Sequence, residues 1–200
     1  MVSNNVLAGL LIIAIVVSVG GIMYQLSLPR IPITITGQAT GTAQVQIASL
    51  ATISLPTDTV NFGSVQNNEV KNTTSLDPYP FVVRNEGTVD INITINASQL
   101  WYGTGATGTS TYYRFNATVN ETGSVYNTTQ NVDLRSITNM PIGATQEWVA
   151  NCTKFTNAND EIRVHIFITV PDDEPAGPKS STVTMTASQA IPGSTNCPNH

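Results

Sequence analysis

The sequence predicts a mainly β protein, with an N-terminal transmembrane helix followed by one immunoglobulin-like antiparallel β-sandwich. Three observations support this fold class. No charged side chain precedes Arg30, and residues 6–26 are almost entirely apolar. From about residue 37, apolar and polar residues alternate with the period of two that is typical of strands. The helical periods between strands that a parallel sheet requires are absent.

The first segment has the length of a membrane span. As a helix, residues 6–26 would extend about 31 Å, close to the hydrocarbon core of a bilayer at roughly 30 Å. Tyr24 falls near its end, where amphipathic aromatic residues favour the interface, and Pro29 stops the helix. We therefore expect a short tail over 1–5 and a signal-anchor helix over 6–28.

Two other interpretations of this segment stay open. It could be a signal peptide cleaved after Gly20, or a prepilin-type leader cut after Gly9 that leaves an apolar assembly helix. The positive-inside rule does not orient the helix, because the N-terminal side offers only the charge of the amino terminus and the other side offers only Arg30. Glycosylation of the later part of the chain would place the N-terminus inside and the bulk of the chain outside.

Alternating segments after the helix are predicted to build the sandwich. Residues 29–42 form an extended linker or a first strand, 43–189 form the sandwich, and 190–200 form a flexible tail. Each predicted strand carries apolar residues on its inward face and polar residues on its outward face. They cover residues 45–55 with a bulge near 48–49, 60–63, 81–84, 89–95, 113–119, 132–134, 162–170 and 181–187, with 148–155 left open between strand and short helix.

Two turns look like hairpin connections. Asn85-Glu86-Gly87-Thr88 lies between two apolar strands and supplies residues that tolerate positive φ, which predicts an antiparallel hairpin over 81–95. Residues 171–177, PDDEPAG, predict a second turn before the last strand. Between the strands, 103–111 is rich in glycine and threonine and predicts a flexible loop.

The order of these segments resembles a group of little-characterised archaeal membrane-anchored cell-surface proteins with an immunoglobulin-like ectodomain. The resemblance covers residues 35–188 and is carried by ITGQATGTAQVQI, VNFGSV, PFVVRNEGTVDINITI, VHIFITVPDDEPAG and SSTVTMTA. Similar turns recur in TasA-like proteins and in archaeal bundling-pilus subunits. The resemblance implies the fold and a surface location, and it implies no catalytic residue, since a shared fold does not establish a shared function.

Composition excludes several function classes. The chain has 8 Lys and Arg, 13 Asp and Glu and a net charge of −5, so it lacks the basic surface that nucleic-acid binding needs. Two histidines and no recognisable catalytic motif predict a protein that is not an enzyme and needs no cofactor. Thr, Ser and Asn are abundant instead, which suits the outward faces of strands.

Seven N-x-S/T sequons predict N-glycosylation, and their parity within the predicted strands places several of them on the outward face. The acceptor residues are Asn72, Asn92, Asn96, Asn116, Asn120, Asn127 and Asn151.

The two cysteines, Cys152 and Cys197, could form a disulfide in an oxidising exterior. Two alternatives stay open: both thiols are free, or they bind zinc together with His165 and His200. His165 has the outward parity of its strand and is predicted to be a surface residue. Cys197 and His200 supply only half of a zinc-binding pattern, so we expect no metal site.

Two further features allow more than one interpretation. The acidic run Asp172-Asp173-Glu174 could bind calcium, or it could be a polar turn. The aromatic pairs 101–102 and 112–113 flank the glycine-rich loop. They could stack on sugars, although packing in the core is the simpler interpretation.

The segment between helix and sandwich carries an apolar face. Ile31, Ile33 and Ile35 alternate with polar residues or proline, so an extended segment there would expose three isoleucines. Each would forgo roughly 1.5–3 kcal/mol relative to burial. The segment is either the first strand of its own domain or a strand donated to the sheet edge of a neighbouring subunit. Donation would require release from the membrane or cleavage of the leader.

Together these features predict a non-enzymatic, membrane-anchored extracellular protein with a structural, adhesive or recognition role. Its expected partners are the membrane and proteins or glycans at the cell surface, with self-assembly possible. The first alternative is a filament or pilus subunit assembled by strand donation. The second is an envelope-associated glycan-binding module or hydrolase that uses the loop near residues 101–115.

Overall fold

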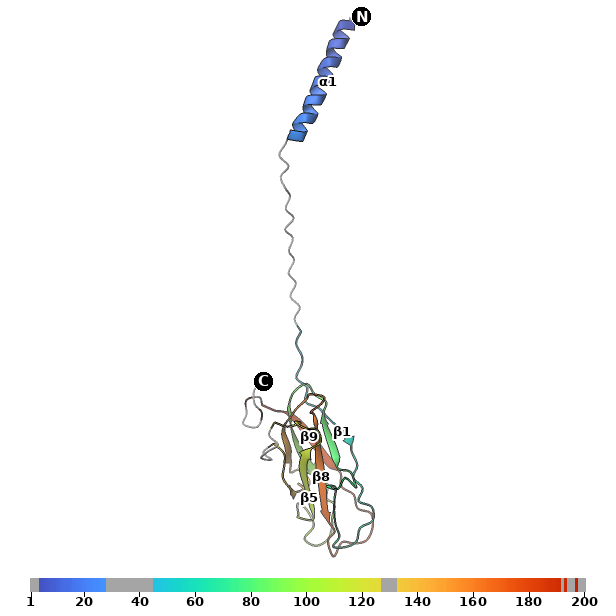
Figure 1. Ribbon diagram of the computed structural model, residues 1–200. Coiled ribbons are helices and arrows are strands. Elements are labelled where there is room, and N and C mark those ends of the chain that lie inside the picture. The colour runs from blue at the N-terminus through green and yellow to red at the C-terminus, as the bar shows by residue number, and fades with distance from the viewer. Residues whose placement is uncertain (1–3, 28–44, 127–132, 192, 194–196, 198–200) are drawn as a thin grey trace. The chain divides into compact units, whose positions relative to one another are not determined.

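The computed structural model describes residues 4–27, 45–126, 133–191, 193 and 197. The chain divides into two compact units, residues 1–45 and residues 46–200. The first unit contains the helix α1 (Asn4–Ser27), and the second contains strands only (Figure 1).

The sequence of α1 explains why this helix is apolar on all sides. Its residues are mostly Leu, Ile, Val and Ala, and neither its first nor its last turn carries a charge. The large apolar side chains that the structure describes along it are exposed. The stretch Asn4–Gly21 is long and apolar enough to cross a membrane, a property that membrane anchors share with signal sequences.

The second unit consists of two antiparallel sheets. In the larger sheet the order is β1-β3-β8-β5-β6, with β2 also paired to β8, and in the smaller sheet it is β7-β4-β9. The strands are β1 (Ile53–Thr57), β2 (Val70–Asn72), β3 (Phe81–Asn85), β4 (Ile91–Ala97), β5 (Tyr113–Val119), β6 (Thr138–Asn139), β7 (Glu147–Thr153), β8 (Glu161–Thr169) and β9 (Val183–Gln189). The prediction of a mainly β protein with antiparallel sheets and an N-terminal apolar helix is confirmed.

One core holds the two sheets together. Ile91, Ile93 and Ile95 of β4 are fully buried and belong to the same apolar cluster as Phe115 of β5 and Ile162 of β8. The intervening residues of β4 are half-buried, which is the alternation that the sequence shows. Burying each of these isoleucines contributes roughly 1.5–3 kcal/mol, so the two sheets cover one another's apolar faces.

The predicted hairpin over 81–95 is wrong in its pairing. β3 pairs with β1 and β8, whereas β4 pairs with β7 and β9, so residues 86–90 carry the chain from one sheet to the other. Alternation reveals that a strand has one apolar face, and it does not reveal whether the next strand lies beside it or opposite it. Residues 170–182 likewise connect β8 in one sheet to β9 in the other.

Of the two predicted strands at the start of the domain, the first is right only at its end, where Ile53 and Leu55 lie in β1, and the second is wrong. Residues 45–50 carry no strand, and Val45 and Ile47 are 89% and 78% exposed. Residues 60–63 carry no strand either, although Val60 and Phe62 pack against the core. The segment 148–155, for which the sequence left both a strand and a short helix open, contains most of the strand β7.

His165 is not a surface residue, because Thr73 and Thr118 flank its ring. Thr73 continues the pairing of β2 along β8, with its backbone N–H donating to the carbonyl of Ile166 at 3.1 Å. The His165 ring contacts the hydroxyl and carbonyl of Thr73 at 3.2 Å and the Thr118 hydroxyl at 2.9 Å. Only 5% of His165 is exposed. Burial lowers its pKa, so the ring is held neutral.

A buried asparagine fixes the connection between the sheets. The side-chain amide of Asn85 donates to the backbone oxygens of Val89 and Thr153 at 3.0 and 3.1 Å and accepts from Gly87 N–H at 3.0 Å. A Cβ at Gly87 would overlap the carbonyl oxygen of Leu50, so this turn also admits only glycine. Asn85 therefore ties the turn after β3 to β7 in the opposite sheet.

Asn85→Ala is expected to reduce the free energy of unfolding by about 2 to 4 kcal/mol, because it leaves buried backbone groups without partners. Chemical denaturation monitored by tryptophan fluorescence measures this change. Asn157→Ala, at an exposed position, is the matched control and should change stability by less than about 0.5 kcal/mol. Equal effects of the two substitutions would contradict the role of Asn85.

Candidate functional site

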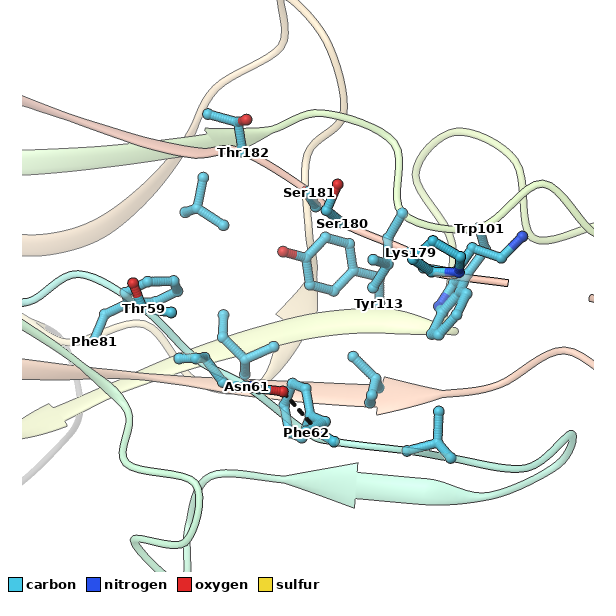
Figure 2. A pocket seen from close by; sticks show the side chains of 18 of the residues that line it. Thr59, Asn61, Phe62, Phe81, Trp101, Tyr113, Lys179, Ser180, Ser181 and Thr182 are labelled. Atoms are coloured by element: carbon cyan, nitrogen blue, oxygen red, sulfur yellow. Dashed lines mark hydrogen bonds between the residues drawn. The ribbon is translucent and has the colours of Figure 1, made fainter. Parts of the chain in front are cut away.

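A groove of about 850 Å³ opens between the two sheets beside β9. One wall is the extended segment 58–65, and the other is the segment 177–182 together with Val183 and Met185 of β9 (Figure 2). Its volume lies in the range of pockets that bind small molecules or peptides.

Apolar and aromatic side chains line the interior of the groove. Phe81, Trp101 and Tyr113 contribute to it (Figure 2) and are at most 9% exposed. The Trp101 indole donates to the carbonyl of Tyr112 at 3.1 Å. Trp101 and Tyr113 therefore belong to the core rather than to an exposed sugar-stacking face, whereas Tyr102 is 67% exposed.

The glycine-rich loop and the acidic turn are bound to each other. Glu174 accepts the N–H groups of Tyr102 and Gly103 at 2.8 and 2.7 Å, and Asp173 accepts that of Thr104 at 2.6 Å. Gly103 is buried, and a Cβ there would overlap the Asp173 carboxylate. The predicted flexible loop is therefore held by hydrogen bonds at its start. The sequence does not reveal this contact, because about 70 residues separate the loop from the acidic turn.

Glu174 is ionised although it is only 5% exposed. Burial opposes the charge, but the ion pair with Lys179 and the two backbone N–H donors outweigh it, so the pKa of Glu174 lies below its ordinary value. Two of the three carboxylates considered as calcium ligands, those of Asp173 and Glu174, thus bind the protein's own amides. Among the described residues, the one group of three side chains spaced like metal ligands is Asp90, Cys152 and Cys197.

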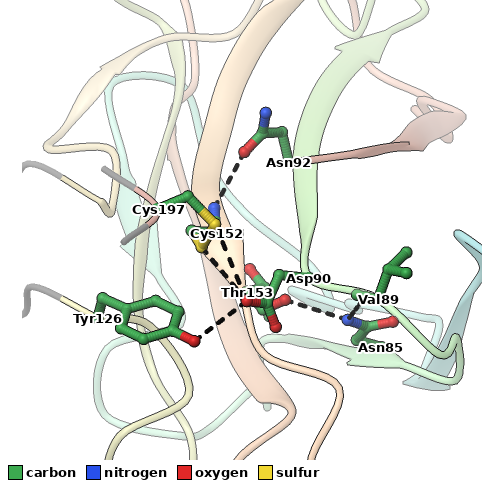
Figure 3. Close-up of a disulfide and its surroundings, with 8 residues drawn as sticks. All are labelled: Asn85, Val89, Asp90, Asn92, Tyr126, Cys152, Thr153 and Cys197. Atoms are coloured by element: carbon green, nitrogen blue, oxygen red, sulfur yellow. Dashed lines mark hydrogen bonds between the residues drawn. A yellow bond between two sulfur atoms is a disulfide. The ribbon is translucent and has the colours of Figure 1, made fainter. Parts of the chain in front are cut away.

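Cys152 and Cys197 form a disulfide, with their Cα atoms 5.3 Å apart (Figure 3). Cys152 and Cys197 are fully or almost fully buried, and the Asp90 carboxylate lies 3.7 and 3.9 Å from their sulfurs. Tyr126 donates to the same carboxylate at 3.1 Å. The bridge links β7 to the chain that follows β9 and leaves neither sulfur available for zinc. His165 lies elsewhere, and His200 lies outside the described residues.

The six sequon asparagines within the described residues are all half-buried. Several use their amides within the fold. Asn92 accepts the N–H of Cys152 at 3.0 Å, Asn96 donates to the carbonyl of Gly143 at 2.7 Å, and Asn120 donates to Glu161. Asn72 accepts from its own sequon residue Thr74 at 3.0 Å, which folds the sequon into a turn.

The remaining sequons differ in their surroundings. Asn116 follows the outward parity of β5, and its amide oxygen is buried without a hydrogen-bond donor. At Asn151 the sequon residue Thr153 is fully buried. Asn127 lies outside the described residues. Glycan attachment at the seven positions stays a prediction.

One buried carboxyl group was missed at the sequence level. Asp160 is 3% exposed, its backbone N–H donates to Glu121 at 2.9 Å, and the Arg84 guanidinium lies 3.9 Å away. Burial and the neighbouring Glu121 charge raise the pKa of Asp160 to about 6, against the opposing effect of Arg84. Nothing in the local sequence signals this, because Glu121 and Asp160 come from different loops.

The comparisons with known proteins identify no relative. No protein-family model matches the chain, and no curated protein matches it in sequence.

Glu174→Gln is expected to reduce the free energy of unfolding by about 1 to 3 kcal/mol at pH 7, because Lys179 loses its charged partner. The lowered pKa of Glu174 means that its contribution is present above about pH 4.5 and is lost as the pH falls below that value. Denaturation of the variant at pH 7 and pH 3.5 measures both effects. Asp172→Asn, at the exposed neighbour, should change neither, and a pH-independent loss at position 174 would contradict the ionised state.

Asp160→Asn is expected to stabilise the protein at pH 7.5 by about 1 to 3 kcal/mol. Because the folded pKa is raised to about 6, the protonated carboxyl favours folding at low pH, and this contribution is lost as the pH rises through 6. The gain should shrink toward zero at pH 4, where the wild-type side chain is also neutral. Thermal unfolding across pH 4 to 8 measures it, and a gain that is constant across this range would contradict the assignment.

Proposed function

We propose that this chain is a membrane-anchored, non-enzymatic protein of the cell exterior, whose immunoglobulin-like sandwich has a structural, adhesive or recognition role. The observation that carries the proposal is the pairing of an uncharged helix with a disulfide-bonded two-sheet domain. Each large apolar side chain described in α1 is exposed, as a lipid-facing helix would have it. Disulfides form and persist in oxidising compartments, which supports placing the domain outside.

The polar groups inside the domain support a structural role. Glu174, Asp160 and His165 are buried, and each contacts groups of the protein's own fold. None of these three side chains lines the groove, whose ionisable lining residues are Asp58, Tyr113 and Lys179, and Lys179 is paired with Glu174. The groove is better suited to holding an apolar partner than to chemistry.

An immunoglobulin-like sandwich is supported by the arrangement of the strands. All strand pairs are antiparallel, and successive strands repeatedly change sheet, as at residues 86–90 and 170–182. Such crossings between two facing sheets are typical of Greek-key sandwiches. Glycans on the outward asparagines belong to the same proposal and would add a solubilising layer to a surface with few charges.

The filament alternative is also favoured by one observation, the open groove beside β9. An edge strand with an uncovered apolar face can accept a strand from another chain.

Intact cells producing the full chain test the proposed location. Added protease should remove residues 46–200 while leaving a membrane-embedded fragment that contains α1, and alkaline carbonate should not extract the uncleaved protein. Thiol titration of the unfolded, non-reduced protein should find no free cysteine. Protection of the domain in intact cells, or its recovery in the soluble fraction, would overturn the proposal. A cytoplasmic control protein must stay intact in the same experiment.

A further inference from the structure

A carboxylate faces the disulfide in a way that suits the reduced cysteines better than the bridged ones. One oxygen of Asp90 lies 3.7 Å from the sulfur of Cys152 and 3.9 Å from the sulfur of Cys197 (Figure 3). A bridged sulfur carries no proton, so it cannot donate a hydrogen bond to this oxygen. Two thiols can donate to it, and a cation can bind all three groups at once.

The three groups are spaced as metal ligands are. The ligand atoms of Asp90, Cys152 and Cys197 all lie within 4.8 Å of one another. In a tetrahedral zinc site, Zn–S bonds of about 2.3 Å and Zn–O bonds of about 2.1 Å separate sulfur from oxygen by about 3.6 Å and sulfur from sulfur by about 3.8 Å. The Asp90 oxygen already lies close to its ligand position. Only the two sulfurs, about 2 Å apart in any disulfide, have to separate.

A bulge in strand β7 directs Cys152 away from the main core. Asn151 and Cys152 lie opposite the single residue Asn92 of β4, and a bulge of this kind re-aims a side chain. Cys152 has a φ of +50°, which non-glycine residues rarely adopt, and Asn92 stabilises it by accepting its N–H at 3.0 Å. Such strained backbone concentrates at functional sites. The Cys152 side chain thereby joins a small separate cluster that includes Cys197 and Tyr126.

The surroundings of Asp90 orient its carboxylate. The Tyr126 hydroxyl donates to the same oxygen at 3.1 Å, and an outer partner of this kind fixes the direction of a metal ligand. The Asp90 carbonyl accepts the N–H of Ala190 at 2.8 Å, which holds the backbone at the end of the β4–β9 pairing. Cys152 and Cys197 are buried, whereas Asp90 is half-buried, so an ion would reach the cluster from the Asp90 side.

We propose that the reduced form of this chain binds one Zn²⁺ ion through the thiolates of Cys152 and Cys197 and the carboxylate of Asp90. Thiolates and a carboxylate are ligands that zinc prefers, and a water molecule completes the tetrahedron. The bound ion links β7 to the chain that follows β9, as the disulfide does in the oxidised form. The C-terminal segment is therefore attached to the smaller sheet in both redox states.

The two forms interconvert by exchange of two electrons. A dithiol reductant gives two electrons and two protons to the bridge and becomes a disulfide itself, which leaves Cys152 and Cys197 as thiols. Zn²⁺ then binds as both thiols release their protons to solvent. In the reverse direction an external disulfide accepts two electrons, takes up two protons and becomes a pair of thiols. The bridge forms again, and the ion is released.

Metal titration of the full chain in detergent micelles tests the proposal. The protein is reduced with a phosphine, freed of it without air and checked for two free thiols. Reduced wild type should bind one equivalent of Co²⁺, with the charge-transfer absorption of thiolate-bound cobalt and the strong visible bands of tetrahedral Co²⁺. One equivalent of Zn²⁺ should abolish both signals, and the oxidised protein should give neither.

Asp90→Asn separates the three-ligand site from binding by two thiols alone. It should weaken the apparent affinity of the reduced protein for Zn²⁺ by at least about tenfold, since even the loss of an outer partner costs about 10–100-fold. Asp172→Asn, at an exposed position, is the matched control and should leave the affinity unchanged. Near-ultraviolet circular dichroism checks that Asp90→Asn is folded. If it is not, Cys197→Ser replaces it and should weaken binding by a similar factor.

Denaturation distinguishes a folded site from thiols that bind metal in an unfolded chain. Zn²⁺ should raise the denaturation midpoint of the reduced wild type and leave that of the oxidised protein unchanged, because a ligand stabilises the state that it binds. Three results would contradict the proposal: no thiolate-to-cobalt absorption in the reduced wild type, a midpoint that Zn²⁺ does not raise, or equal affinities of the wild type and the folded ligand variant.

Discussion

Mutual burial of alternating apolar faces is the interaction on which the rest of the domain depends. The central strands β4, β5 and β8 each present buried residues to one shared core, and neither sheet could hold its apolar face in water alone. The two sheets are unequal, with six strands in one and three in the other. This inequality leaves part of the larger sheet without a facing strand, and the groove beside β9 lies there.

Charge within the domain serves mainly to close loops. Few charged residues are available, and two acidic ones bind backbone amides: Glu174 binds those of residues 102–103, and the half-buried Glu121 binds those of Asp160 and Glu161. Hydrogen bonds to an ionised carboxylate are stronger than those between neutral groups, so one glutamate can hold an entire glycine-rich segment. Threonine and asparagine take over the solvent-facing role that charged residues have in most soluble domains.

The sequence predicts the strands of this fold better than it predicts their neighbours. Alternation located β3, β4, β5, β8 and β9, because period-two burial is a local property. It assigned β3 and β4 to one hairpin, since the same pattern arises whether two strands pair or face each other. His165 was misread, and the burial of Glu174 was missed, for a related reason: the groups that contact them belong to residues 73 and 102–103, far away in the sequence. The isoleucine face at 31–36 was visible locally, whereas the groove beside β9 exists only in the folded domain.

The disulfide also determines how the domain carries mechanical load. Cys197 follows β9 in the sequence but is bonded to Cys152 in β7, at the opposite edge of the smaller sheet. A pulling force applied to the chain beyond Cys197 therefore enters the domain through β7 and bypasses β9. Under tension, an edge strand is ordinarily the first to peel away, one hydrogen bond at a time. Here the covalent bridge would spare β9 that load, and the edge next to the groove would keep its shape while the protein is pulled.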